Sequence, residues 1–198
     1  MKHLLITLSL ALLAPVYLFS QTTWKSPTFK PESLRSVMIL AQVEDKTAKQ
    51  QLEDFTVKYL TDKGIRAVAA YTTLKRIKFA TREDFLAYTD TLGVDGLLVY
   101  AVEDAEKVVV NQPTVSVGVG VGGMYGGYVG ASAPIAGGAK TVIQVGMSGK
   151  FYTRSTEGSQ WIISLKGELD GPTDKLAASF AKTTAKAMIK DGLFKPNK

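Results

Sequence analysis

Cysteine is absent from this chain of 198 residues, and histidine occurs once, as His3. Without cysteine there are no disulfide bonds, thiolate metal ligands or thiol nucleophiles, and we expect no lipid anchor. His3 lies in a segment that we expect to be removed, which excludes histidine-ligated zinc and the Ser-His-Asp and Cys-His nucleophilic sites. We therefore predict that the protein is not an enzyme, with no catalytic residues, no cofactor and no metal site.

Residues 1–20 have the organisation of a secretory signal peptide. Lys2 provides a basic start, 4–13 is almost wholly apolar, and the small residue Ser20 precedes Gln21. The apolar run is shorter than the roughly 20 residues of a membrane-spanning helix. We predict cleavage after Ser20 and a periplasmic or secreted protein, with an uncleaved anchor as the alternative. Export without disulfides favours a domain large enough to be stable by itself.

Charge is low and spread out along the rest of the chain. The formal net charge falls from +6 to +5 when Lys2 is removed, and the densest basic cluster is 75–78. Aromatic residues do not interleave with this cluster, so we expect no nucleic-acid binding. About 178 residues follow Ser20, which is enough for a single core that buries roughly 70% of the unfolded surface.

Strand and helix patterns alternate in the first half of the expected domain. We expect strands at 36–43, 65–71 and 97–102, separated by helices at 47–63 and 81–92. Each helix begins with a capping-box pattern and is followed by glycine: Thr47 with Gln50 before Gly64, and Thr81 with Asp84 before Gly93. The apolar runs at 36–43 and 97–102 favour strands covered on both faces. The pattern predicts an α+β fold, with helices packed on a mixed β-sheet.

The second half is expected to contain a hairpin and a closing helix. Strands at 140–153 and 160–169 flank a turn at 156–159, and the last helix covers 173–191. The apolar face of that helix is formed by Leu176, Phe180, Thr184, Ala187 and Met188. We therefore expect an extended arm at 21–35, one domain at 36–192, and a tail at 193–198.

A glycine-rich insertion at 111–139 is the least ordinary part of the sequence. Valine alternates with small residues from 115 to 121, as in a strand, and we expect Pro134 to interrupt pairing farther on. Three interpretations stay open: a flexible loop or cover for the sheet edge, a contact with another subunit or partner, and contact with lipid. The candidate contact residues are Val115, Val117, Val119, Val121, Tyr125 and Tyr128.

Two other patterns resemble binding sites but lack the context that such sites require. Residues 118–123 match a dinucleotide fingerprint literally, but that fingerprint requires a helix to open at its last glycine, and 124–128 cannot start one. The acidic pairs 44–45, 83–84 and 103–104, with Glu106, have no calcium-loop spacing and suit solvated strand and helix ends.

The stretch Leu92-Gly93-Val94-Asp95-Gly96-Leu97-Leu98-Val99-Tyr100 resembles the helix-to-strand turn of the TolB N-terminal domain and of CsgG-type envelope proteins. The order of the expected elements over 36–191 is similar to theirs as well. The resemblance implies an α/β sandwich, an accessory role without catalysis, and a β-hairpin or loop extension. It supplies no catalytic residue.

We therefore predict a non-enzymatic, exported cell-envelope protein that serves as an accessory or interaction module. Its partner is expected to be another envelope protein or a second copy of the chain, and any membrane association would not use a transmembrane helix. The alternative is a CsgG-like oligomeric, membrane-associated or pore-forming component. An enzyme using only carboxylates, such as a glycosidase, is a more distant third.

Overall fold

The computed structural model describes residues 20–30, 34–74, 82–122, 128–154, 156, 158–169 and 172–194, and along 82–83, 110–122 and 128–141 it describes the backbone. The expected signal peptide up to residue 19, the basic cluster at 75–78, Thr81, Tyr125 and the end of the tail lie outside the described residues.

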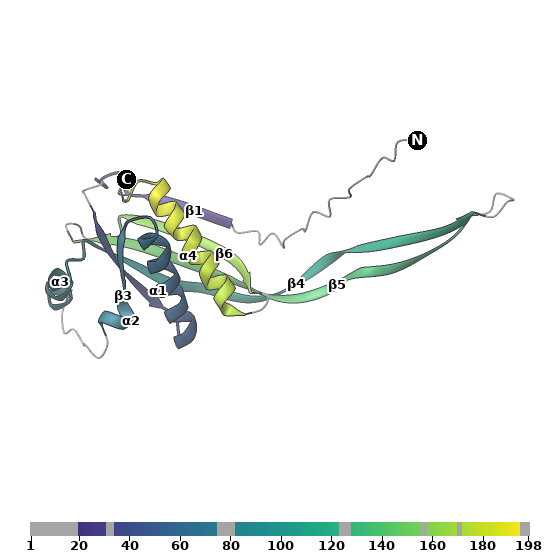
Figure 1. The fold of residues 1–198 in the computed structure, drawn as a ribbon, viewed down its shortest axis with the longest axis horizontal. Helices are drawn as coiled ribbons and strands as arrows, with labels where there is room; N and C mark the ends of the chain where they lie inside the picture. The colour runs from purple at the N-terminus through teal and green to yellow at the C-terminus, as the bar shows by residue number, and fades with distance from the viewer. Residues whose placement is uncertain are drawn as a thin grey trace, which may run out of the picture.

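The fold is built on one mixed sheet with the strand order β1-β6-β5-β4-β2-β3 (Figure 1). The strands are β1 (Ser20–Lys25), β2 (Ser36–Gln42), β3 (Arg66–Ala69), β4 (Gly96–Gly122), β5 (Tyr128–Thr153) and β6 (Trp161–Leu169). The helices are α1 (Lys46–Thr61), α2 (Ala70–Thr73), α3 (Arg82–Thr91) and α4 (Thr173–Lys190). β2 is parallel to β3 and β4, and the remaining pairs are antiparallel. The predicted α+β class is confirmed.

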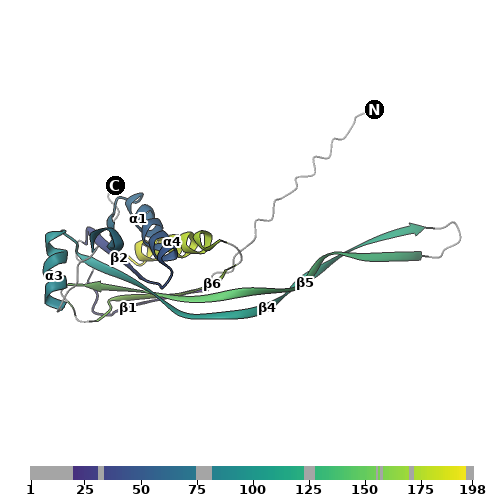
Figure 2. The same ribbon diagram turned by 90° about the horizontal axis from the view of Figure 1, so that it is seen from below.

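Helices α1 and α4 pack side by side over one face of the sheet and close the main core (Figures 1 and 2). The largest buried side chains on this side come from every layer: Ile39, Leu52, Leu98, Tyr100, Phe151, Trp161, Ile163, Phe180 and Met188. The apolar stripe expected on the last helix is confirmed, because Phe180, Ala187 and Met188 are buried.

Within the described residues, the opposite face of the sheet is covered at one end, by α2 and α3. A small second cluster forms there around Met38, Ala70 and Val94. Leu40 and Leu97 pack against this cluster and, like Val99 farther along the same face, are half-buried. The expectation that 36–43 and 97–102 are covered on both faces is therefore wrong beyond this cluster. An apolar run reports which residues avoid water, but not how far the second helix layer reaches.

The turn from α3 to β4 is held by backbone geometry and by one carboxylate. Gly93 has a φ of 61°, a left-handed conformation that favours glycine. The Asp95 Oδ2 atom accepts hydrogen bonds from the backbone N–H of Arg35 (2.9 Å) and of Ser36 (3.0 Å), and from the Ser36 hydroxyl (2.9 Å). The turn thereby fixes where β2 starts beside β4.

Gly96 begins β4 under an aromatic ring. A Cβ atom at this position would lie 2.4 Å from Cζ of Phe151, which is fully buried. Glycine is required here because the ring takes the space of a side chain.

Two local expectations in the first half are corrected. The N-cap of α1 is Asp45, whose Oδ1 atom accepts from the Ala48 N–H at 2.6 Å, rather than Thr47. The strand expected at 65–71 ends at Ala69, and the chain enters α2 at the next residue. Tertiary contacts shorten this strand.

Buried Glu53 on α1 satisfies the backbone where β3 leaves the sheet. Its Oε1 atom accepts from the Ala41 N–H at 3.0 Å, and its Oε2 atom accepts from the Tyr71 N–H at 2.9 Å. The last pair between β2 and β3 is Ile39 with Ala69, and Ala41 lies two residues beyond Ile39 on β2. The carboxylate thus joins the end of one strand to the start of α2.

The segment expected as an extended arm contains β1, which runs antiparallel to β6. Its register extends from Ser20 opposite Lys166 to Lys25 opposite Trp161. All six residues of β1 are exposed, as suits a strand at the sheet edge.

Strands β4 and β5 continue far beyond the body as a two-stranded ribbon, clearly visible in Figures 1 and 2. The paired register runs from Gly96 opposite Thr153 to Gly122 opposite Tyr128. The expectation that Pro134 interrupts pairing is wrong, since it lies opposite Ser116. Proline is tolerated on a strand with a free outer edge, because its missing N–H is not needed there. The register of the ribbon shifts between Gln112 and Val115 and again between Val115 and Ser116, beside Pro134.

Candidate functional site

The ribbon has two strand edges that pair with nothing in the described part of the chain. The last pair between β2 and β4 is Gln42 with Ala101, and the last pair between β5 and β6 is Ile143 with Leu169. Beyond these points β4 and β5 pair only with each other. We name this region, residues 102–122 and 128–142, the extension. Unpaired edges are templates for strand addition, and an isolated two-stranded ribbon is marginally stable in water.

The predicted contact residues lie in the distal part of the extension. The backbone register places Val115 opposite Ala136, Val117 opposite Ala133, Val119 opposite Ala131, Val121 opposite Val129, and Gly122 opposite Tyr128. The structure thus brings five of them into one ribbon, and Tyr125 falls outside the described residues. Their role in binding stays a prediction. The literal dinucleotide fingerprint begins inside β4, and no helix begins at 118–122.

The root of the extension carries acidic side chains. Glu103, Asp104 and Glu106 are exposed on β4, just past the point where β2 ends. Within the described residues, no group of three or more acidic or histidine side chains is placed to hold a metal ion. Charged side chains on a strand edge discourage unspecific pairing, and that role suits these carboxylates.

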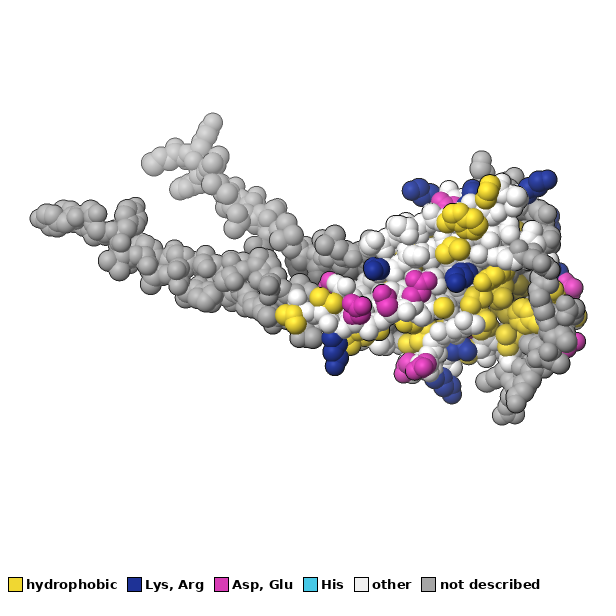
Figure 3. Space-filling model, turned by 180° about the vertical axis from the view of Figure 1, so that it is seen from behind, with side chains coloured by type: hydrophobic (Ala, Val, Ile, Leu, Met, Phe, Trp, Pro, Cys, Tyr) yellow, Lys and Arg dark blue, Asp and Glu magenta, His cyan; other side chains and the backbone are white. Residues whose placement is uncertain are grey.

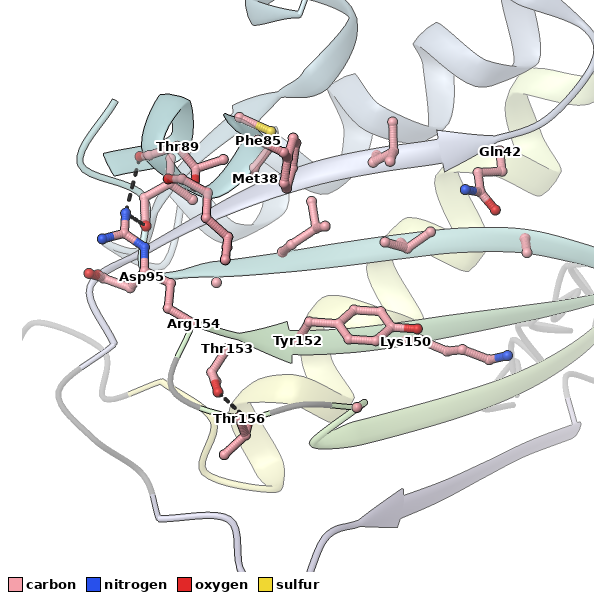
Figure 4. A pocket seen from close by; sticks show the side chains of 18 residues that line it. Met38, Gln42, Phe85, Thr89, Asp95, Lys150, Tyr152, Thr153, Arg154 and Thr156 are labelled. Carbon is pink, nitrogen blue, oxygen red and sulfur yellow. Dashed lines mark hydrogen bonds between the residues drawn. The ribbon is translucent and has the colours of Figure 1, made fainter. Parts of the chain in front are cut away.

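A groove on the sheet face opposite α1 and α4 is the main feature that sequence reasoning missed. Its volume is about 690 Å³, and its floor is made by Leu40 of β2 and by Leu97, Val99 and Ala101 of β4 (Figure 4). Phe85 and Leu86 of α3 form one wall, and the turn after β5 forms another. Figure 3 shows hydrophobic side chains gathered on this face, over the body.

Some polar side chains of the groove bond to neighbouring elements, and others have no hydrogen bond or ion pair within the described residues. Arg154 binds the carbonyl oxygens of Thr89 (3.1 Å) and Val94, and pairs with the Asp90 carboxylate. Gln42, Lys150 and Tyr152 have no side-chain hydrogen bond or ion pair within the described residues. In Figure 4 the side chains of Lys150 and Tyr152 extend away from α3, towards the end of the groove where Gln42 lies.

The register explains how these residues come together. Leu40 lies beside Val99, Val99 opposite Lys150, Lys150 opposite Ile162, and Ile162 opposite Trp24. This row crosses five strands on one face, because residues directly opposite in a sheet share a face. Trp24 at its end is 49% exposed. In the sequence, Lys150 and Tyr152 alternate with buried Phe151, which was the available signal.

Two buried titratable groups lie on the opposite, closed side. Burial raises the pKa of Tyr100 to about 12, and its hydroxyl lies 3.1 Å from the Thr56 hydroxyl of α1. Burial also raises the pKa of Glu53, an effect opposed by its two backbone hydrogen bonds. Neither group faces the groove, so both belong to the core.

No protein-family model matches the chain, and no curated protein matches it. A PelC dodecamer from Paraburkholderia phytofirmans is similar with a TM-score of 0.48 and 15% identity, covering 91% of this chain and 100% of that chain. A variant of the same dodecamer in a second crystal form has a TM-score of 0.47 and 13% identity, covering 89% of this chain and 98% of that chain. A minor lipoprotein from Acinetobacter baumannii has a TM-score of 0.38 and 7% identity, covering 83% of this chain and 98% of that chain.

Likeness at this level carries no conclusion about what the chain binds or does. None of these neighbours is described as a TolB N-terminal domain or a CsgG-type protein, so that resemblance stays a prediction. Among the described residues, no helix is both long and apolar enough to cross a membrane.

Proposed function

We propose that the protein is a non-enzymatic interaction module of the cell envelope, which associates with other chains through the extension. The observation that carries the proposal is the pair of strand edges beyond Ala101 and Ile143 that no described strand pairs with. Further strands would replace water on the backbone N–H and C=O groups along these edges and would stabilise a ribbon that is marginal by itself. The added strands come from a second copy or from another envelope protein.

The acidic root supports pairing in the distal part rather than close to the body. Glu103, Asp104 and Glu106 are exposed beside the free edge of β4, and like charges placed side by side oppose pairing between copies. The predicted contact residues Val115, Val117, Val119, Val121 and Tyr128 lie beyond this acidic root. The role of Tyr125 and Tyr128 as contact anchors rests on the preference for tyrosine in interfaces.

Export is part of the same proposal. Cleavage after Ser20 would remove one of the six residues of β1 and leave Gln21–Lys25 opposite Leu165–Trp161. The mass and N-terminal sequence of the protein from a fractionated cell check this step. A chain that starts at Gln21 in the periplasmic or secreted fraction supports export, and a full-length chain in the cytoplasm contradicts it.

The extension is tested by a chain that lacks it. In this shortened variant, an Asn-Gly turn replaces 111–139 and joins Val110 to Lys140, which are opposite each other in the register. The expected result is that the protein starting at Gln21 forms assemblies or captures an envelope partner, while the shortened variant does neither and keeps the same unfolding midpoint. Light scattering with and without detergent, and partner capture, give the readouts.

Each outcome has a meaning. Equal mass and equal capture by both proteins would contradict the proposal. Assemblies of fixed size that form only in detergent would move the interpretation to the CsgG-like membrane component. Loss of folding in the shortened variant is detected by its unfolding curve, and substituting lysine at Val117 and Val119 then tests the same edges in the intact chain.

A further inference from the structure

The groove has the dimensions of a ligand site rather than of a packing defect. Its volume of about 690 Å³ lies within the range of about 300–1,000 Å³ that is typical of small-molecule sites. The floor follows β2 from Met38 to Gln42, a length of roughly 13 Å at about 3.3 Å per residue. The site is therefore long and shallow, with a wall of α3 at one end.

The floor is apolar along most of this length. Leu40, Leu97 and Val99 are half-buried, so they present apolar surface to whatever lies in the groove. Phe85 closes the end beside α3. Covering these side chains would remove apolar surface from water, which is favourable.

The other end of the groove offers hydrogen-bond donors and one positive charge. Lys150 is the cation of the lining without an ion pair in the described part of the chain, since Arg154 is already bound to Asp90. The Gln42 amide and the Tyr152 hydroxyl lie towards the same end (Figure 4). An ammonium, an amide N–H and a phenol O–H can all donate to one carboxylate.

We propose that the groove binds a long-chain fatty acid, with the carboxylate at Lys150 and the hydrocarbon chain along Val99 and Leu97 towards Phe85. The charge pattern carries this assignment, because one cation at the end of an apolar floor complements one anion at the end of an apolar chain. Nucleic acid would need several cations along the groove. The site is independent of the extension, which lies beyond Ala101.

The experiment uses the intact protein that starts at Gln21 and a fluorescent polyene fatty acid as the probe. We expect saturable binding, displacement by palmitate, and about tenfold weaker displacement by the matching alcohol, which lacks the carboxylate charge. Lys150→Glu should weaken probe binding at least about tenfold, since it replaces attraction by repulsion. Lys150 is exposed, so this change leaves the fold intact.

Two control proteins sharpen the result. Lys182→Glu makes the same charge change on an exposed position of α4, on the opposite face, and should bind as the parent does. The shortened variant should also bind as the parent does, which separates failure of this proposal from failure of the proposed function. Val99→Glu places a charge on the floor itself and should abolish binding.

Three results would overturn the proposal. One is the absence of saturable binding, and another is equal binding by the parent and by Lys150→Glu. The third is a parent protein that is dimeric through this face, becomes monomeric in Val99→Glu, and binds no probe. In that case a second copy occupies the groove.

Discussion

Individual residues in the turn between α3 and β4 determine how the sheet is assembled. Gly93 adopts the left-handed backbone, Asp95 fixes the start of β2, and Gly96 leaves room for the Phe151 ring. The similarity of 92–100 to a known turn pattern therefore has a steric and hydrogen-bonding explanation in this chain.

Gly96→Ala should destabilise the protein by about 1–3 kcal/mol, because the added methyl group would overlap the Phe151 ring in a packed core. Phe151 also makes an edge-to-face contact with Phe194, with ring centroids 5.8 Å apart, so the ring has little room to move. Urea denaturation measures the change. Combining the substitution with Phe151→Leu should cost less than the sum of the two single changes, and strict additivity would contradict the explanation.

Glu53 should make the stability of the protein depend on pH. Burial raises its pKa above the ordinary 4.5, so the folded protein holds the proton more tightly than the unfolded chain does. Its contribution to stability is complete below pH 4.5 and is lost as the pH rises through the raised pKa. Glu53→Gln should remove this contribution to the dependence of the unfolding free energy on pH.

Unfolding free energies measured at intervals from pH 4 to 7 check the Glu53 prediction. The matched control is Glu44→Gln, which makes the same charge change at an exposed position just before α1. An unchanged slope in the Glu53→Gln protein would show that another group is responsible.

At the scale of elements, α1 is attached to the sheet by polar groups as well as by apolar packing. Glu53 binds the backbone of β2 and α2, and the Tyr100 hydroxyl of β4 meets Thr56. The Tyr100–Thr56 contact spans 44 residues of sequence, whereas Glu53 joins α1 to the preceding strand and to α2. They define the orientation of α1 on the sheet.

Tyr100 should limit the stability of this attachment at alkaline pH. Its pKa is raised to about 12, so the folded state keeps the proton where the unfolded state, with a pKa near 10, loses it. The contribution is present below pH 10 and is lost between about pH 10 and 12, and it amounts to roughly 2–3 kcal/mol. Tyr100→Phe should show a shallower alkaline loss than the parent in urea titrations. Tyr152→Phe, at a half-buried groove position, is the control that should behave as the parent does.

At the scale of the whole molecule, the chain combines a closed core with open surfaces. One sheet face is sealed by α1 and α4, while the other holds the groove and the extension leaves the body with free edges (Figures 1 and 2). The proposed association and the proposed ligand site use different open surfaces. The two are therefore separable in the same molecule.

Mixing the parent protein with an excess of the shortened variant tests whether assembly depends on the extension of every copy. We expect the mass of parent assemblies to stay unchanged, because the variant lacks the strand edges that would join them. Labelled variant should elute apart from the assemblies in size-exclusion chromatography. Incorporation of the label would mean that copies meet through the body.

The sequence alone was sufficient for the α+β class and for most of the helices and strands. Periodic apolar positions such as Phe180, Ala187 and Met188 predict a buried helix face, and Gly93 predicts the end of α3. These features are local, since they depend on neighbours within one or two turns. The absence of cysteine excludes disulfide bonds and thiolate ligands from the sequence alone.

Only the tertiary structure decided which strand edges and faces remain open. The early end of β3, the pairing of Pro134 with Ser116, and the groove beneath Lys150 and Tyr152 depend on partners far away in the chain. A half-buried valine and a fully buried valine look the same in a sequence, because hydrophobicity does not record what covers a residue. The long-range placement of α3 and the ends of β2 and β6 determine that coverage, and with it the surfaces available for binding.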